Sequence, residues 1–336
     1  MGNQQNHVPS QERFETDKLT HIVSGAGYDQ RAKNKLLRIQ TRVSTLLSVP
    51  SDYHILLYDL NQIGGVNIFR ALKLNGNSRC GFVDAGSRSS LAISNARDYH
   101  EVEIIGSSRE SNYSYVPNAD WIPFDISFLH FTSTNEKEGN RKTRFPKIKI
   151  PLLLDMSSDL FSTKVRVEDF SMIYAVGNNR IIPDDLCLVI VQNRFLTNRG
   201  YSLRAEPGLV GKGGQFVQGI FASMFLFDHN LRELEKMGGI IEYKKRFEAR
   251  SGMLYKEIER NSKFCCSVNP QDRAATAVRF SLIAADDILP FAVRLDTDNF
   301  NVIIRCFHGE FLVLVEKFSQ QEMLKLICLM QEFELK

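Results

Sequence analysis

The sequence has no apolar run that approaches the ~18 residues of a membrane-spanning helix. Its first residues, MGNQQNHVPSQERFETDK, are polar and lack the apolar core that a signal peptide needs. The acidic residues Glu12, Glu15 and Asp17 also argue against a transit peptide. We therefore expect no association with a membrane.

The chain also lacks a large net charge. The chain has 42 Lys and Arg against 39 Asp and Glu, and the formal net charge of +3 does not by itself indicate a nucleic-acid partner. The six cysteines form no CxxC pair, and the adjacent Cys265 and Cys266 make a poor chelate, so no metal site is predicted. A reducing compartment is the simplest assumption, and we expect an intracellular protein, with the cytoplasm favoured.

Short apolar runs are present in regular order, separated by segments of helical periodicity. The runs that we interpret as buried strands are HILLYDL (54–60), GFVDAG (81–86), VEIIG (102–106), ISFLHFT (126–132), IPLLLD (150–155), SMIYAV (171–176) and LCLVIV (186–191). Helices are predicted before Pro50 and over 66–74 and 87–99. Continuous apolar strands that alternate with helices indicate an α/β fold, with a mostly parallel sheet covered by helices on both faces.

The length of 336 residues suits more than one domain. We expect an N-terminal arm over residues 1–30, a large domain over 31–238 and a small C-terminal α+β domain over 239–336. The segment 240–261 is predicted to form a long helix that joins the two domains. Three apolar runs and a last helix, 320–335, complete the smaller domain.

The most informative stretch runs from 150 to 191. Its first strand ends at Asp155, which Met156, Ser157 and Ser158 follow, and its second strand leads into GNNRIIP (177–183). This arrangement resembles the cofactor-binding centre of the phosphoserine aminotransferase family, whose members are class V aminotransferases with the PLP-transferase fold of type I. LSVPSDYHILL, VDAGSRSSLAISNARDY and FLHFTSTNEKEG resemble further segments of that family in the same order. The likeness covers the chain from about residue 44 to the C-terminus.

Carried over residue by residue, the resemblance places Asn179 where the family has the lysine that forms a Schiff base with pyridoxal phosphate (PLP). An asparagine amide cannot form an imine, because its nitrogen lone pair is delocalised into the carbonyl group. Asn178 stands where the family has the preceding glutamine. The glycine-rich turn that cradles the PLP phosphate matches the segment around Gln62, where Cβ atoms restrict close approach of the backbone.

The resemblance gives four further positions. Arg88 stands in place of a tryptophan that stacks on the pyridine ring. Three interpretations of this arginine stay open: it stacks on a flat group, it binds an anion, or it is a surface arginine at a helix start. Glu136 stands in place of a threonine that contacts the 3′-oxygen, and a carboxylate there is expected to repel the PLP phenolate. Asp155 matches the carboxylate that pairs with the pyridinium nitrogen, and Arg305 matches an arginine that binds the substrate α-carboxylate. Each also has a purely structural interpretation: Asp155 as a cap of local N–H groups, and Arg305 as a partner in an ion pair.

These substitutions predict a catalytically inactive pseudoenzyme without PLP, which acts as a binding or structural subunit. The family resemblance implies a homodimer, and a protein partner in a larger assembly is compatible with it. The first alternative is a diverged but active class V PLP aminotransferase of the phosphoserine:2-oxoglutarate type. A further alternative is a nucleic-acid-associated scaffold that uses the basic segments 141–149 and 243–250.

Overall fold

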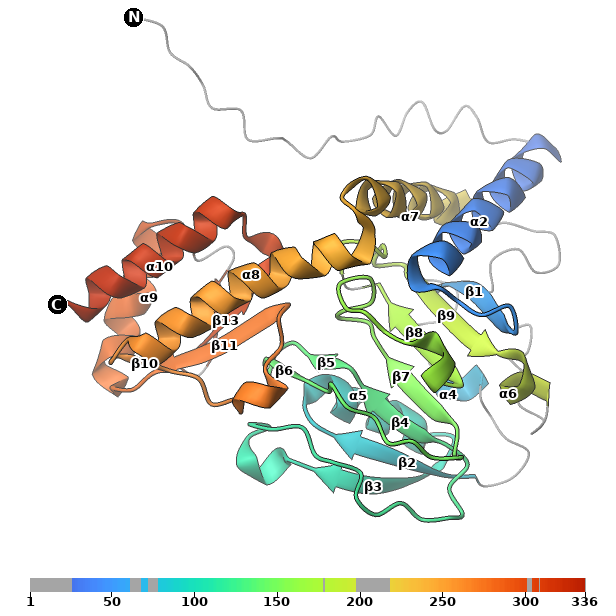
Figure 1. Cartoon of the computed structure of the whole chain (residues 1–336), viewed down its shortest axis with the longest axis horizontal. Coiled ribbons are helices and arrows are strands. Elements are labelled where there is room, and N and C mark those ends of the chain that lie inside the picture. Colours follow the sequence, from blue (N-terminus) through green and yellow to red (C-terminus); the bar gives the residue numbers. More distant parts are fainter. Residues whose placement is uncertain are drawn as a thin grey trace, which may run out of the picture.

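The computed structural model describes residues 26–60, 68–71, 78–177, 179–197, 218–300, 304–307 and 309–335. The two larger β-sheets lie on either side of the molecule, and the long helix α8 (Gly239–Arg260) runs from one to the other (Figure 1). The strands β5 (Thr134–Asn135) and β6 (Asn140–Arg141) form a small third sheet. Among the residues that the structure describes, no helix combines the length and the apolar character that a membrane crossing requires.

The larger sheet has seven strands in the order β1-β9-β8-β7-β4-β2-β3. Their bounds are β1 (Tyr53–Asp59), β2 (Arg79–Asp84), β3 (Glu101–Ser107), β4 (Leu129–Thr132), β7 (Leu152–Asp155), β8 (Met172–Val176) and β9 (Leu186–Gln192). Strand β9 runs antiparallel to its neighbours β1 and β8, and the other neighbouring pairs are parallel. The predicted α/β fold with a mostly parallel sheet is therefore confirmed.

Successive residues of the strands point to opposite faces of this sheet, so each strand contributes to two cores. Leu188 belongs to the core on one face, with residues of α2 (Ala26–Leu47) and α7 (Gln218–Lys236). Val189 belongs to the core on the other face, with residues of α4 (Ile68–Ala71), α5 (Ser87–Arg97) and α6 (Asn193–Thr197). Burial on both faces explains why the strands are apolar without alternation.

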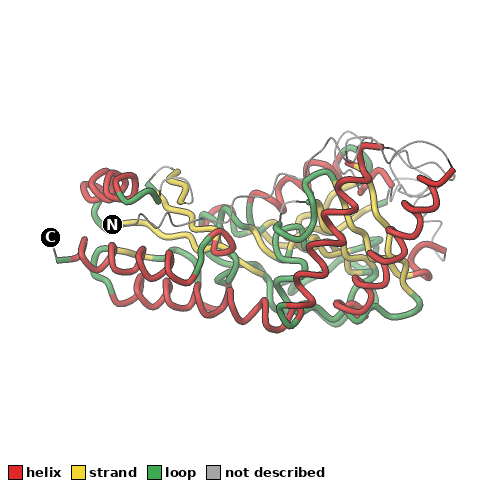
Figure 2. The backbone as a smooth tube through the Cα atoms, turned by 90° about the horizontal axis from the view of Figure 1, so that it is seen from above, coloured by secondary structure: helices red, strands yellow, loops and turns green. Residues whose placement is uncertain are grey.

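The smaller sheet is antiparallel, with the order β10-β11-β13-β12. Its strands are β10 (Phe264–Cys265), β11 (Ala277–Leu282), β12 (Ile304–Phe307) and β13 (Glu310–Leu314), and the helices α9 (Ile288–Thr297) and α10 (Gln320–Glu334) accompany them. Figure 2 shows α8 and α10 side by side along this sheet. Asn261, at the end of α8, links the two helices by donating to the Met330 carbonyl at 3.0 Å.

Two details differ from the sequence-based prediction. Helix α2 begins at Ala26, so part of the predicted arm is helical; residues 1–25 lie outside the described residues. Helix α9 was not predicted, and its third residue is Pro290. Proline is tolerated there because the amides of a first helical turn have no partner within the helix. The domain boundaries at 31–238 and 239–336 stay a prediction.

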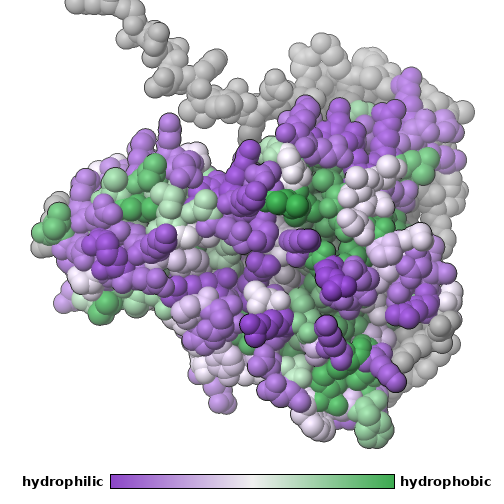
Figure 3. All heavy atoms as spheres, viewed as in Figure 1, coloured by the Kyte–Doolittle hydropathy of each residue, from purple (hydrophilic) through white to green (hydrophobic). Residues whose placement is uncertain are grey.

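The surface in Figure 3 is hydrophilic over much of the visible face, and hydrophobic side chains gather toward the end of the larger sheet near β3. The most exposed large hydrophobic residues in that part of the chain are Trp121 and Phe124, in the segment between β3 and β4.

In the turn from β8 to β9 the backbone at Gly177 lies very close to the backbone at Pro183. The Gly177 amide donates to the Leu186 carbonyl at 2.7 Å, and a Cβ atom added at Gly177 would lie 1.8 Å from the Pro183 carbonyl oxygen. That oxygen is part of the backbone, so it cannot move aside as a side chain can. Only glycine therefore allows the two strands of the turn to approach this closely.

We expect Gly177→Ala to lower the free energy of unfolding by about 3 kcal/mol, because the backbone must shift to admit the Cβ atom. Gly252→Ala is the matched control. An added Cβ at Gly252, inside α8, meets no atom within 4 Å, so this change is expected to stabilise by about 0.5–1 kcal/mol. Urea denaturation of both variants measures the difference, and equal effects would contradict the role of Gly177.

Candidate functional site

Asp155 is the last residue of β7 and lies at the carboxyl end of the parallel strands, where α/β folds place their ligands. Its Oδ1 atom accepts hydrogen bonds from the Ser157 amide at 2.9 Å and from the Ser157 hydroxyl at 2.5 Å. The Val176 amide, at the end of β8, donates to the same hydroxyl at 3.0 Å. Ser157 thus fixes the Asp155 carboxylate relative to two neighbouring strands.

Two buried polar side chains support Asp155 from inside the sheet. Tyr174 is its register neighbour on β8, and burial raises the pKa of the Tyr174 hydroxyl well above its ordinary value. The hydroxyl lies 2.9 Å from Nε2 of His130 on β4. Burial lowers the pKa of His130 to about 4, so its ring is neutral at physiological pH. Sequence reasoning treated both residues as parts of strands, although a polar residue within a buried strand was the available signal.

Asn179 lies in the turn between β8 and β9, and its side-chain amide holds that turn. The amide oxygen accepts from the backbone amides of Ile181 at 3.0 Å and Ile182 at 2.9 Å. The amide nitrogen donates to the Ser157 carbonyl at 3.0 Å. Asn179 therefore ties the turn to the same residue that fixes Asp155, and all three contacts are local structural bonds.

Glu136 and Arg88 reach the same region from other elements. Glu136 follows the short strand β5 (Thr134–Asn135), and Arg88 lies in the first turn of α5. Burial raises the pKa of Glu136 to about 7, while the nearby Arg88 counteracts this shift. Ser158 also lies within reach of the Glu136 carboxyl group. The structure thus brings together Asp155, Asn179, Arg88 and Glu136.

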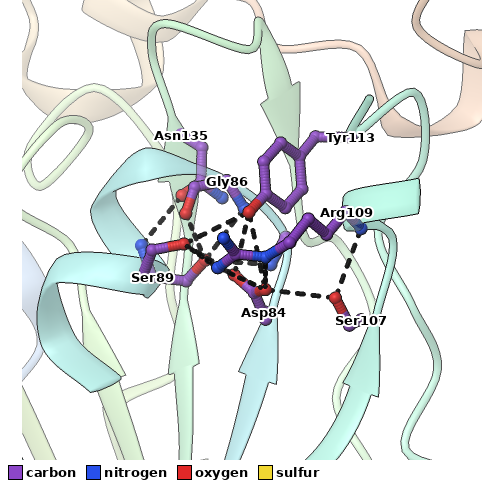
Figure 4. Close-up of polar contacts among 9 residues, drawn as sticks. Asp84, Gly86, Ser89, Ser107, Arg109, Tyr113 and Asn135 are labelled. Atoms are coloured by element: carbon purple, nitrogen blue, oxygen red, sulfur yellow. Dashed lines mark hydrogen bonds and ion pairs between the residues drawn. The ribbon is translucent and has the colours of Figure 1, made fainter. Parts of the chain in front are cut away.

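The N-terminus of α5, which carries Arg88, is fixed by the carboxylate of Asp84 at the end of β2 (Figure 4). Asp84 accepts hydrogen bonds from Ser90 at 2.9 Å, Ser107 at 3.1 Å and Arg109 at 3.1 Å. Asn135 accepts a hydrogen bond from the Ser89 amide at 3.1 Å and so ties α5 to β5. These contacts tie α5, which carries Arg88, to β5, which directly precedes Glu136.

The remaining predicted site residues are not placed in the same way. Gln62 and Asn178 lie outside the described residues, and so does most of the turn around Gln62. Arg305 lies in β12 of the smaller sheet, paired in register with Leu312. The side chains that come together in the described part of the chain therefore come from the larger sheet.

The residues present fit a pyridine cofactor at two points. Asp155 offers a fixed carboxylate at the end of a parallel strand, which is the group that such a nitrogen requires. Because its pKa is near 7, Glu136 carries a proton in a large share of molecules at neutral pH and can donate a hydrogen bond to an oxyanion. The predicted repulsion between Glu136 and a phenolate rested on the ordinary pKa of glutamate, and burial removes that premise.

The architecture defines a fold class, the PLP-transferase fold of type I. A phosphoserine aminotransferase from Bacillus circulans subsp. alkalophilus has a TM-score of 0.76 at 19% identity, over 94% of this chain and 89% of its own. PLP-bound phosphoserine aminotransferase from Trichomonas vaginalis has a TM-score of 0.73 at 16% identity, over 92% of this chain and 90% of its own. Likeness at this identity shows the fold.

Sequence comparison then defines the family. Phosphoserine aminotransferase from Flavobacterium psychrophilum is 30% identical over 273 residues, which cover 74% of each chain. The enzyme from Flavobacterium johnsoniae is 32% identical over 61% of this chain and 59% of its own. No family model matches the sequence. On the strength of these relatives, the chain belongs to the phosphoserine aminotransferase family.

These findings correct three predictions. The chain was predicted to be a pseudoenzyme, not an enzyme, and to have lost PLP; all three predictions are wrong, because its relatives are enzymes by name and a solved structure of the same fold has PLP bound. The predictions assumed that every residue that differs from the family removes one contact to PLP, and they took each side chain with its ordinary properties. Ser157 holds the Asp155 carboxylate at the end of β7, and Glu136 has a pKa that admits a neutral form.

We expect Asn179→Ala to lower the free energy of unfolding by about 1–3 kcal/mol, because two backbone amides lose their acceptor. Asn179→Asp keeps that acceptor and loses only the donor to Ser157, so it is expected to cost less. Chemical denaturation of the three proteins checks the order. An alanine variant as stable as the wild type would contradict the clamping role of Asn179.

The pKa of Glu136 has a consequence for stability. Between pH 4.5 and about 7 the folded chain retains a proton on Glu136 that the unfolded chain has lost, so this group makes stability fall as pH rises. In Glu136→Gln the decline across that window is expected to be smaller, and Glu110→Gln, at an exposed site, should match the wild type. Urea titrations at pH 5 and pH 7.5 measure it; a pH-independent effect of Glu136→Gln would refute the assignment.

Proposed function

We propose that this protein is a diverged, PLP-dependent aminotransferase of the phosphoserine:2-oxoglutarate type. Its place among phosphoserine aminotransferases supports the reaction class, and the fixed carboxylate of Asp155 is the observation that carries the proposal to this chain. PLP, when bound, supplies an electron sink for chemistry at the substrate α-carbon.

The residues of this chain have distinct parts in the proposal. Asp155 faces the pyridine nitrogen and keeps it protonated, since an adjacent carboxylate favours the charged form of a base. Glu136 donates a hydrogen bond to the oxygen on the ring when it is protonated. Arg88 offers a planar guanidinium group, which stacks well on a flat ring. Arg305 is proposed to bind the substrate α-carboxylate, the function that the family resemblance gives it.

A more specific part of the proposal concerns how PLP is held near Asn179. We propose that this residue stands in place of the Schiff-base lysine, so that the protein holds PLP through non-covalent contacts alone. The three hydrogen bonds of Asn179 support this proposal, because they engage both its oxygen and its nitrogen in the β8–β9 turn. A lysine supplies the general base in transamination, so we expect a rate well below that of enzymes that retain it.

The predicted partners stay predictions, a homodimer first among them. The basic segments offer less free charge than their sequence indicates. In 141–149, Lys142 is buried and donates to the Pro117 carbonyl at 2.8 Å. In 243–250, Lys244 and Lys245 pair with Glu248 and Glu242 on the same helix. A nucleic-acid partner is accordingly not part of the proposed function.

The proposal predicts that purified protein, supplied with PLP, phosphoserine and 2-oxoglutarate, forms glutamate at a rate above that of PLP alone. We expect Asp155→Asn to lower both PLP affinity and this rate about tenfold or more, because a charge-assisted hydrogen bond is lost. The change preserves shape and keeps an oxygen that can accept from Ser157. Coupled detection of glutamate and titration with PLP provide the two readouts.

Asp184→Asn is the matched control, since Asp184 is exposed in the same turn as Asn179 and should leave both readouts unchanged. Treatment with borohydride followed by peptide mass spectrometry tests the role of Asn179: no PLP is expected on the peptide that contains 177–183. Absence of glutamate formation at every PLP concentration would refute the proposed function, whereas a PLP-modified lysine would refute only the non-covalent binding.

A further inference from the structure

A second cavity lies outside the candidate site and has a volume of about 690 Å³, which suits a small molecule. The turn that follows Asn179, the end of α7, the first half of α8 and the start of α10 line it. These elements meet where α8 leaves the larger sheet (Figure 1). The cavity shares no residue with the group formed by Asp155, Glu136 and Arg88.

Three arginines line this cavity, namely Arg180, Arg246 and Arg250. Within the described parts of the chain, none of the three has a carboxylate within ion-pair distance, although two glutamates also line the cavity. Glu233 instead pairs with Lys236 at 2.7 Å, and Glu242 pairs with Lys245 at 2.5 Å. Lysines thus neutralise these two glutamates. Burial raises the pKa of the nearby Glu316, whose carboxyl group acts on Arg180, so the net positive charge of the cavity comes mainly from Arg246 and Arg250.

The arginines also lie close enough to act on one another. Burial lowers the pKa of Arg250, and the positive charges of Arg180 and Arg246 lower it further. Arg250 donates to the Phe318 carbonyl and Arg180 donates to the Glu316 carbonyl at 2.9 Å, so backbone oxygens take up only part of their donor capacity. Each guanidinium has five N–H donors. A multivalent anion between the three guanidinium groups offsets their mutual repulsion and accepts from the N–H donors that the backbone oxygens leave free.

The rest of the cavity wall suits a small organic anion. Tyr243, which lines it, is largely buried and offers an aromatic surface. Ser319, the N-cap of α10, also lines the cavity, but the Glu322 carboxylate already accepts from its amide at 2.7 Å, so the positive charge of the cavity comes from its arginines. A planar carboxylate has only two oxygens for three guanidinium groups. A tetrahedral phosphate accepts from several directions and matches the arrangement better.

We propose that the cavity lined by Arg180, Arg246 and Arg250 is a binding site for a phosphate-bearing small molecule, separate from the aminotransferase site. Neither the proposed reaction nor PLP is required for this inference. The site holds its ligand through the guanidinium groups of two elements, the β8–β9 turn and α8. Binding therefore links the turn that carries Asn179 to the helix that joins the two sheets.

Inorganic phosphate is the probe, measured by isothermal titration calorimetry in the absence of PLP and at constant ionic strength set with chloride. We expect Arg246→Ala and Arg250→Ala each to weaken phosphate binding about tenfold or more, because each removes a charge-assisted contact. Arg38→Ala is the matched control: Arg38 is exposed on α2, does not line the cavity, and its removal lowers the net charge equally.

Arg246 keeps the test independent of folding. Its side chain is exposed and Nη1 donates to the sulfur of Met237, whereas removal of Arg250 takes donors from the Phe318 and Arg246 carbonyls. Phosphate should raise the melting temperature of the wild type more than that of Arg246→Ala, because a ligand of the folded state stabilises it. Equal phosphate binding by the wild type and both variants would overturn the proposal, because it would place the phosphate elsewhere, for example at the turn around Gln62. Succinate binding as tight as that of phosphate would overturn the assignment to phosphate.

Discussion

The side-chain amide of Asn179 is the interaction on which the organisation of the candidate site depends. Through one oxygen it satisfies two backbone amides in the turn after β8, and through its nitrogen it reaches the Ser157 carbonyl after β7. Ser157 in turn fixes the Asp155 carboxylate. The close approach of Gly177 to the Pro183 carbonyl requires such a clamp, since a turn this tight leaves backbone groups without partners in the sheet.

The turn that Asn179 clamps is also the point at which the sheet changes from parallel to antiparallel pairing. A chain that leaves a parallel strand normally crosses over through a helix before it returns. Here the turn sends the chain straight back as β9, which pairs antiparallel with β8 and then with β1. The antiparallel strand therefore sits inside the sheet, between the first strand and the parallel set that ends in Asp155. A rigid turn at this point fixes the edge of the candidate site.

The strands were predictable from the sequence because burial on both faces leaves them apolar throughout, as in LCLVIV and IPLLLD. Asp155 was predictable too, since it is the polar residue that ends such a run. The order of the strands was not, because the pairing of β9 with β1 joins residues far apart in the chain. The charge state of Glu136 was equally out of reach, as it depends on burial and on Arg88 from another helix. Helix α9 escaped prediction because Pro290 interrupts its pattern.

The erroneous prediction of an inactive protein arose from the treatment of each substituted residue as an isolated side chain with its ordinary properties. Inside the fold these properties change: Glu136 has a pKa near 7, and His130 is neutral because burial opposes its charge. The effects of single residue differences therefore cannot simply be added to predict that the whole site is inactive. Asp155 illustrates a different case, in which the amide and the hydroxyl of Ser157 hold one carboxylate in position.

Asn179 and Arg180 are consecutive residues, yet one contacts Ser157 at the candidate site and the other lines the arginine cavity. A ligand in the cavity limits the positions that Arg180 can take, and through the backbone it limits those of Asn179. By thermodynamic reciprocity, any preference of the cavity ligand for one arrangement of the turn appears as an equal change in the affinity of the candidate site for its own ligand. Because Asn179 is bonded to Ile181, Ile182 and Ser157, a displacement of Arg180 is opposed at the candidate site.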